Sequence, residues 1–253
     1  MKLAGKTAIV TGGAGYIGSA IVDKLIEEGA RVAVFDLDPV AMEKQKESYN
    51  KRDIKIETLS VDICEYEQVV DTVAKVKDLF GRIDILVNNA GVSARSKARL
   101  FVDQKWEVFR QVVELNLFGT LHCIHAVLPG MIEADYGKII NITSLVGIKG
   151  VRAHMDYGAA KAGIINATQT LAMEVAGKHI NINCVSPGKV PRPGEVPGDE
   201  AAFVKRYTTH TRFCTGDDIA EMTAFLATDA AEYICGQNFI VDGGRSLGLR
   251  GDY

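Results

Sequence analysis

Short runs of β-branched and other apolar residues alternate with longer helical patterns along the whole 253-residue chain. The runs that we expect to form strands are 7–10, 31–36, 55–62, 83–87, 138–143, 180–186 and 238–241. The segments that we expect to be helical are 17–28, 39–50, 69–80, 103–128, 156–176 and 217–228. Strands separated by helices pair in parallel through right-handed crossovers, which place helices on both faces of the sheet. The sequence therefore predicts an α/β fold of the Rossmann type, with a doubly wound, parallel, seven-stranded sheet.

The chain shows no internal repeat, no linker and no break in composition, so we expect residues 1–253 to form a single domain. The irregular segment that begins at Lys189 contains three of the six prolines, Pro191, Pro193 and Pro197. It follows the carboxyl end of the expected sixth strand, where open α/β sheets keep their ligand crevice. We expect residues 189–212 to form a lid over a substrate.

The composition excludes several classes of protein. With 47% hydrophobic and 24% charged residues, the chain is not of a disordered or low-complexity type. The net charge of −3 gives no reason to expect a nucleic acid or a membrane as partner. The five cysteines are scattered and odd in number, which favours free thiols in a reducing compartment. Together with an N-terminus that lacks an apolar signal core, this predicts a cytoplasmic protein.

A glycine-rich stretch, Gly13-Ala14-Gly15-Tyr16-Ile17-Gly18, lies between the first expected strand and the first expected helix. Glycines there allow backbone N–H groups at a helix N-terminus to approach a pyrophosphate, although a Gly-rich turn would look the same. Asp36 lies at the end of the second strand, eighteen residues beyond Gly18, and no Lys or Arg lies between 36 and 43. A carboxylate in this position binds the adenosine ribose hydroxyls and repels a 2′-phosphate, so Asp36 favours NAD(H) over NADP(H) unless it is an ordinary loop acid.

Four polar residues form a candidate catalytic set. Tyr157 and Lys161 lie four residues apart, on one face of a helix, although chance alone can produce such a pair. Ser144 lies thirteen residues earlier at the end of the fifth strand, and Asn116 lies in the preceding helical region. A nearby ammonium lowers the pKa of a phenol, so that Tyr157 could exchange a proton with an alcohol or carbonyl. Ser144 would then hold the substrate oxygen.

With these residues in place, the chain resembles the short-chain dehydrogenase/reductase family over nearly its whole length. The resemblance rests on Thr11-Gly12, Gly18, Asp62, Asn88-Asn89-Ala90-Gly91, Asn116, Ser144, Tyr157-x-x-x-Lys161, Pro187-Gly188 and Asp242-Gly243-Gly244. It implies that Tyr157 is the catalytic acid/base, that Ser144 orients the substrate, that Lys161 also holds the nicotinamide ribose and that Asn116 anchors a water. The positions that it implies for binding NAD are Gly12, Gly15, Tyr16, Ile17, Gly18, Asp36, Asp62, Ile63, Asn89, Ala90, Gly91, Tyr157, Lys161, Pro187, Gly188 and Val190. It also implies a homotetramer or a homodimer.

Two positions depart from the pattern of the compact, single-domain members. These usually carry TGxxxGxG, whereas Tyr16 replaces the middle glycine here and gives the TGxxGxxG loop of the extended members. The length of the chain leaves no room for the further substrate domain of those members, so we expect a compact member with an extended-type loop. The family usually has a threonine five residues after Pro187, where this chain has Arg192, which puts the usual contact to the nicotinamide amide in doubt.

Basic residues recur in the loops that would face the crevice: Arg95, Lys97, Arg99, Lys149, Arg152, Lys189 and Arg192. They are either solvated loop charges or the binding site for an anionic substrate, with Arg152 and Arg192 as the main candidates. We expect no metal, because His122 and His125 lack a third ligand nearby.

The sequence thus predicts an NAD(H)-dependent oxidoreductase that interconverts a small-molecule secondary alcohol and a ketone by hydride transfer. An NADPH-type 3-oxoacyl carrier ketoreductase is an alternative from the same family. A non-catalytic dinucleotide-binding sensor is a second alternative, although such a protein would not need Ser144 and Tyr157. A sugar-nucleotide epimerase or dehydratase gains support only from the glycine loop.

Overall fold

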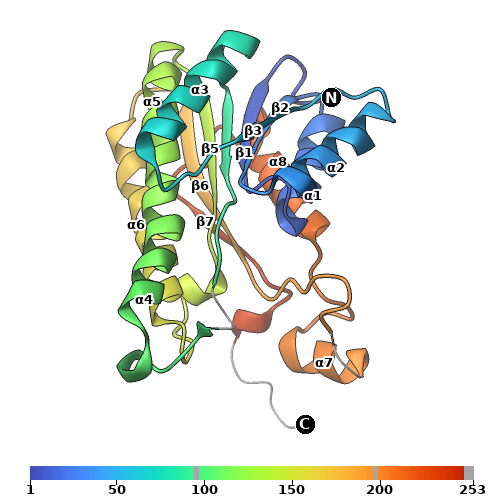
Figure 1. Cartoon of the computed structure of the whole chain (residues 1–253), viewed down its shortest axis with the longest axis vertical. Coiled ribbons are helices and arrows are strands. Elements are labelled where there is room, and N and C mark those ends of the chain that lie inside the picture. Colours follow the sequence, from blue (N-terminus) through green and yellow to red (C-terminus); the bar gives the residue numbers. More distant parts are fainter. Residues whose placement is uncertain (94–96, 197–198, 248–253) are drawn as a thin grey trace.

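A seven-stranded parallel sheet runs through the centre of the computed structural model, which describes residues 1–93, 97–196 and 199–247 (Figure 1). Its strands are β1 (Thr7–Thr11), β2 (Arg31–Asp36), β3 (Glu57–Ser60), β4 (Ile85–Asn88), β5 (Gly137–Ile142), β6 (Ile180–Pro187) and β7 (Asn238–Val241). They follow the spatial order β3-β2-β1-β4-β5-β6-β7, so the order reverses between β1 and β4. The predicted α/β fold is confirmed, and the reversal places the expected ligand crevice beyond the carboxyl ends of β1 and β4.

Helices cover both faces of the sheet, with α1, α2 and α8 on one side and α3, α5 and α6 on the other (Figure 1). Their bounds are α1 (Tyr16–Glu27), α2 (Pro39–Asn50), α3 (Tyr66–Phe80), α4 (Trp106–Val113), α5 (Gly119–Glu133), α6 (Met155–Glu174), α7 (Glu200–Tyr207) and α8 (Gly216–Ala227). Five short helical turns complete the described structure: Phe101–Asp103, Glu114–Phe118, Leu145–Gly147, Asp229–Ala231 and Arg245–Leu247.

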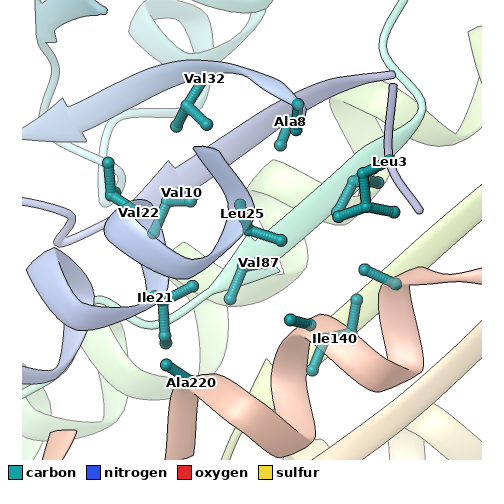
Figure 2. Packing of buried hydrophobic residues seen from close by; sticks show 14 of the residues in the cluster. Leu3, Ala8, Val10, Ile21, Val22, Leu25, Val32, Val87, Ile140 and Ala220 are labelled. Atoms are coloured by element: carbon teal, nitrogen blue, oxygen red, sulfur yellow. The ribbon is translucent and has the colours of Figure 1, made fainter. Parts of the chain in front are cut away.

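Each of the five inner strands, β2, β1, β4, β5 and β6, contributes to two hydrophobic cores because successive side chains point to opposite faces. In β1, Ala8 and Val10 pack with α1 and α8, whereas Ile9 packs with α3 and α5. Figure 2 shows the first of these cores, where Ile21 and Leu25 of α1 approach the sheet beside α8. Burial on both faces explains why the strands are almost continuously apolar in the sequence.

The long helical segment predicted at 103–128 differs from the structure at both ends. A 3₁₀ turn at Phe101–Asp103 comes first, and α4 begins only at Trp106. A π-helical turn, Glu114–Phe118, then joins α4 to α5 without a break. At the other end, α5 continues past Pro129 to Glu133. Pro129 is exposed, so water can satisfy the carbonyl that loses its intrahelical donor at this proline.

The segment 189–212, which we expect to form a lid, contains a helix that the sequence did not predict, α7. The carboxylate of Asp199 caps that helix by accepting a hydrogen bond of 3.1 Å from the N–H of Ala202. Residues 197–198, which include Pro197, lie outside the described residues. In Figure 1, α7 lies beyond the carboxyl ends of the strands, at the same edge as α4.

One helical run within the described residues, Trp106–Glu133, is long and apolar enough to cross a membrane by length and composition. Its buried side chains Cys123, Ile124, Val127 and Met131 belong to the core beneath the sheet. Packing in that core accounts for the apolar character of this run.

Candidate active site

The glycine loop between β1 and α1 leaves no space for side chains at its key positions. Gly12 has φ of +61°, and a Cβ there would lie 2.8 Å from the Cα of Ala90. A Cβ on Gly18 would collide with the carbonyl oxygen of Gly12, and Gly15 is the N-cap of α1. The loop is therefore a bare backbone surface at a helix N-terminus, which fits a pyrophosphate. Tyr16 and Ile17 lie in the first turn of α1, which begins one residue before the predicted start at 17.

Asn89 and Thr11 hold this loop against the end of β4. The Asn89 side chain donates hydrogen bonds to the carbonyl oxygens of Thr11 (3.1 Å) and Gly12 (2.9 Å). The hydroxyl of Thr11 accepts the N–H groups of Asn89 and Ala90, both at 3.0 Å. These contacts join the carboxyl ends of β1 and β4 at the switch point of the sheet.

Asp36 lies at the end of β2 and faces the glycine loop. One carboxylate oxygen accepts the N–H of Ala14 at 3.0 Å, and the other accepts the N–H groups of Leu37 and Asp38. The next acid, Asp38, caps α2 by accepting hydrogen bonds from Val40 and Ala41. The end of β2 and the turn after it thus carry two carboxylates, Asp36 and Asp38, of which Asp36 contacts the glycine loop, and residues 36–43 include no Lys or Arg.

Asp62 and Ile63 follow β3 at the same edge of the sheet. Asp62 accepts the N–H of Cys64 at 2.9 Å, and the Ile63 side chain packs against Gly119 of α5. The Nδ1 atom of His122 lies 2.9 Å from the Ile63 carbonyl oxygen, and that of His125 lies 2.7 Å from the Tyr66 hydroxyl. Within the described residues, no group of three or more His, Cys, Asp or Glu could hold a metal ion.

Asn116 and Lys161 meet at Gly91, although they come from different helices. A Cβ on Gly91 would lie 2.5 Å from Oδ1 of Asn116 and 3.3 Å from Nζ of Lys161. The amide nitrogen of Asn116 donates to the carbonyls of Val92 and Val112, whereas its Oδ1 atom is buried without a hydrogen-bond partner among the described residues. Such an orphaned acceptor is rare in a folded protein, where buried oxygens normally have a protein or water partner.

Lys161 is buried beneath Tyr157 on α6. Its ammonium donates a hydrogen bond of 2.9 Å to the carbonyl of Ile142 and lies 5.7 Å from the centroid of the Tyr157 ring. Burial lowers the pKa of Lys161 from 10.5 to about 8, since no carboxylate compensates for the lost hydration. The lysine therefore still carries its charge at neutral pH.

Ser144 lies at the end of β5 and begins the turn that rests on α6. Its Oγ atom accepts the N–H of Val146 at 3.2 Å. That turn packs closely on α6, because a Cβ on Gly147 would lie 2.9 Å from the backbone of Lys161. The fold thus brings the segments that carry the predicted catalytic residues to one edge of the sheet: the end of β5, the first half of α6 and the π-helical turn with Asn116.

Gly188 and Val190 follow β6, on the other side of the switch point. A Cβ on Gly188 would lie 2.7 Å from Cβ of Asp242, so Pro187 and Gly188 pack against the segment that follows β7. The carbonyl of Gly243 accepts hydrogen bonds from the Thr209 N–H and from the hydroxyls of Thr208 and Thr209. These bonds attach the end of the 189–212 segment to the carboxyl edge of the sheet. A cavity of about 160 Å³, lined in part by Lys189, lies beside them.

The two arginines predicted to bind substrate, Arg152 and Arg192, are both exposed. Neither forms an ion pair with another described residue. Arg95, which the sequence grouped with them, lies outside the described residues.

Sequence reasoning missed two glutamines that support the site. The side chain of Gln45 donates to the carbonyl of Gly13 at 2.9 Å, and that of Gln104 donates to Asp156 at 3.0 Å. Both contacts join segments far apart in the chain, and no local pattern distinguishes these glutamines from surface residues.

The buried charge of Lys161 predicts a pH-dependent stability. Below pH 8 the folded and unfolded chains both carry this proton, so the folded protein bears the full cost of burying the charge. Between about pH 8 and 10.5 only the unfolded chain keeps the proton, so the free energy of unfolding rises with pH. Lys161→Met removes the titrating group. We therefore expect the free energy of unfolding of the wild type to rise by about 3 kcal/mol relative to that of the variant between pH 7 and pH 11. Urea unfolding of both proteins across this range measures the difference, and a difference independent of pH would contradict the prediction.

Comparison with known proteins agrees with this geometry. The family model described as enoyl-(acyl carrier protein) reductase matches residues 12–246. The chain is 33% identical to the 3-oxoacyl-[acyl-carrier-protein] reductase FabG of Thermotoga maritima, over 96% of this chain and 99% of that protein. It is 34% identical to the NAD-dependent glycerol dehydrogenase of Listeria innocua, over 96% of this chain and 94% of that protein.

A solved structure of levodione reductase is similar to the whole chain, with a TM-score of 0.90, 28% identity and coverage of 98% of this chain and 100% of that chain. Members of the family bind a nicotinamide dinucleotide, act on small molecules and commonly form oligomers. The model match, the relatives and the fold agree, and the chain belongs to the short-chain dehydrogenase/reductase family of oxidoreductases.

Proposed function

We propose that this protein is an NAD(H)-dependent oxidoreductase that interconverts a secondary alcohol and a ketone. The observation that carries the proposal is the buried ammonium of Lys161 beneath the Tyr157 ring, next to the unpartnered Oδ1 atom of Asn116. A positive charge in a low-dielectric site favours a phenolate at Tyr157, which can accept or return a proton at neutral pH. A protein that only binds the dinucleotide gains nothing from this arrangement.

The bound dinucleotide supplies the hydride acceptor or donor. In the oxidative direction, Ser144 Oγ holds the substrate oxygen while the Tyr157 phenolate removes the hydroxyl proton. A water on the Asn116 Oδ1 atom, next to Lys161 Nζ, then carries the proton away from the tyrosine. In the reductive direction Tyr157 donates its proton to the carbonyl oxygen, and the same water returns one.

Asp36 supports NAD rather than NADP as the cofactor. Its carboxylate is already fixed toward the glycine loop by the N–H of Ala14, and Asp38 adds a second negative charge two residues away. A 2′-phosphate placed there would meet Asp36 and Asp38, with no Lys or Arg between 36 and 43. The relative from Listeria innocua, whose name states NAD dependence, is compatible with this choice.

We further propose that Arg152 and Arg192 bind an anionic group of the substrate, with 189–212 as the lid that closes over it. Both guanidinium groups are exposed and without ion-pair partners among the described residues, which leaves their donors available to a carboxylate or phosphate. The protein would work as a homodimer or homotetramer in the cytoplasm, where its five free cysteines stay reduced.

An absorbance assay of NADH tests this function over paired substrates, each pair being a neutral secondary alcohol and its carboxylated analogue. We expect turnover with NAD⁺ at least about thirtyfold better in kcat/KM than with NADP⁺, and a lower KM for the charged member of each pair. Asp36→Ala is the specificity control and should bring the two cofactors within a few-fold, because it removes both the ribose acceptor and the repulsive charge.

Preference of the wild type for NADPH with 3-oxoacyl thioesters would establish the carrier ketoreductase instead. NADH binding without turnover of any pair would contradict the proposed reaction and favour the alternatives without net redox, such as a sensor.

A further inference from the structure

Asp156, the residue before Tyr157, caps the helix that carries the proposed acid/base. Its Oδ1 atom accepts the Tyr157 N–H at 2.7 Å, whereas His154 at the N-cap of α6 makes no capping bond with its side chain. N–H groups in a first turn lack intrahelical acceptors, and a carboxylate also interacts favourably with the positive end of the helix. Asp156 therefore takes the place of a capping side chain, and the N–H group that it binds is that of Tyr157.

The other oxygen of Asp156 leads to a different element. Asp156 is only 4% exposed, and its Oδ2 atom accepts a hydrogen bond of 3.0 Å from Nε2 of Gln104. The Oε1 atom of Gln104 in turn accepts the N–H of Lys105, the N-cap of α4, at 3.2 Å. A continuous series of hydrogen bonds thus runs from the entry of α4 to the first turn of α6.

We propose that Gln104 and Asp156 form a positioning pair that fixes Tyr157 by holding the first turn of α6 against the entry of α4. This inference rests on the proposed role of Tyr157 and adds two residues that act through it without touching substrate. A carboxylate buried this deeply is stable only while hydrogen-bonded, so loss of Gln104 lets the turn move to find solvent. Displacement of a catalytic group by about 1 Å is enough to cost up to a hundredfold in rate.

Three variants test the pair, together with the double variant. We expect Gln104→Ala and Asp156→Ala each to lower kcat about tenfold, while KM and the NADH dissociation constant change less than twofold. The double variant should also lose about tenfold rather than a hundredfold, because both changes break the same link. Asp156→Asn should stay within threefold of the wild type. The side-chain oxygen of the variant can still accept the Tyr157 N–H, and its amide nitrogen can donate to Oε1 of a rotated Gln104.

A second readout does not depend on turnover. Trp106, the single tryptophan of the chain, lies two residues beyond Gln104 and stacks on Phe109 at 4.8 Å. Asp156→Ala, on the other helix, should therefore change the fluorescence of Trp106, whereas Asp156→Asn should not. Hydrogen exchange at the Tyr157 amide should become at least about tenfold faster in Gln104→Ala. If the wild type turned over no substrate, the proposed function would fail. The fluorescence of Trp106 and the hydrogen exchange at Tyr157 would still test whether Gln104 and Asp156 fix the first turn of α6.

The proposal is overturned if Gln104→Ala keeps kcat within twofold of the wild type with unchanged exchange at Tyr157. It is also overturned if the losses of the two alanine variants multiply in the double variant. Urea unfolding accompanies each measurement. If Asp156→Ala does not fold, the comparison of Gln104→Ala with Asp156→Asn still tests the proposal.

Discussion

Tyr157→Phe should lower kcat by about a thousandfold or more and leave the affinity for NADH nearly unchanged. The phenol oxygen is the only part removed, and proton transfer by a positioned side chain contributes about 10²–10⁴ in rate. Lys161 remains buried and bonded to the carbonyl of Ile142, so the fold around the variant ring keeps its charge and its packing. Stopped-flow measurement of NADH formation gives kcat, and quenching of NADH fluorescence gives the dissociation constant.

A matched control for this variant is Tyr233→Phe. Tyr233 is fully exposed on the loop before β7, far along the chain from the proposed site, and its loss should change kcat less than twofold. Residual activity of Tyr157→Phe above a few per cent would remove Tyr157 from the role of acid/base. A parallel loss of NADH binding would show that the ring acts in cofactor binding instead.

Gly18→Ala should abolish tight binding of NADH and destabilise the protein. Alanine is the better helix former by about 1 kcal/mol, so helix propensity alone predicts stabilisation at this position in α1. The new methyl group would meet the carbonyl oxygen of Gly12 and, at 2.8 Å, the amide nitrogen of Asn89. Because the first of these is backbone, the glycine loop itself has to move, and we expect a net loss of about 2 kcal/mol in unfolding free energy.

The displaced loop can no longer present its N–H groups to a pyrophosphate, so we expect NADH to bind about a hundredfold more weakly. Gly130→Ala in α5 is the control, since a Cβ there has no heavy atom within 4 Å apart from the chain neighbours and the helix's own nearby backbone. That variant should be as stable as the wild type or slightly more so, with unchanged NADH binding. If Gly18→Ala bound NADH as tightly as the wild type and were equally stable, the added methyl group would fit and the glycine loop could not be tightly packed.

The sequence predicts the inner strands of the sheet well because burial on both faces leaves a strong signal in each of them. Val10 and Ile9 pack into different cores, and both must be apolar, so the run cannot be mistaken for a surface loop. Helix ends carry a weaker signal. Pro129 suggests an end to α5, yet an exposed proline can be accommodated within a helix when water takes the freed carbonyl.

The candidate site was predictable where one residue type is required at one place. Gly12, Gly18 and Gly91 each lie where a side chain would strike backbone or the Asn116 side chain, and such positions stay visible as motifs. The supporting contacts were not predictable. Gln104 and Gln45 act through partners 52 and 32 residues away, and an amide at these positions has no distinguishing neighbours in sequence.

The π-helical turn at Glu114–Phe118 restricts insertions and deletions in this part of the chain. Each residue added to a regular helix rotates everything after it by about 100°. Deleting one residue from this turn would restore a regular helix but would turn Cys123 and Val127 away from the sheet, or else Asn116 away from Gly91. Only the irregular turn lets Cys123 and Val127 face the sheet while Asn116 faces Gly91. Related chains should therefore vary freely in the identity of the exposed residues here, while the number of residues between Asn116 and the core of α5 stays fixed.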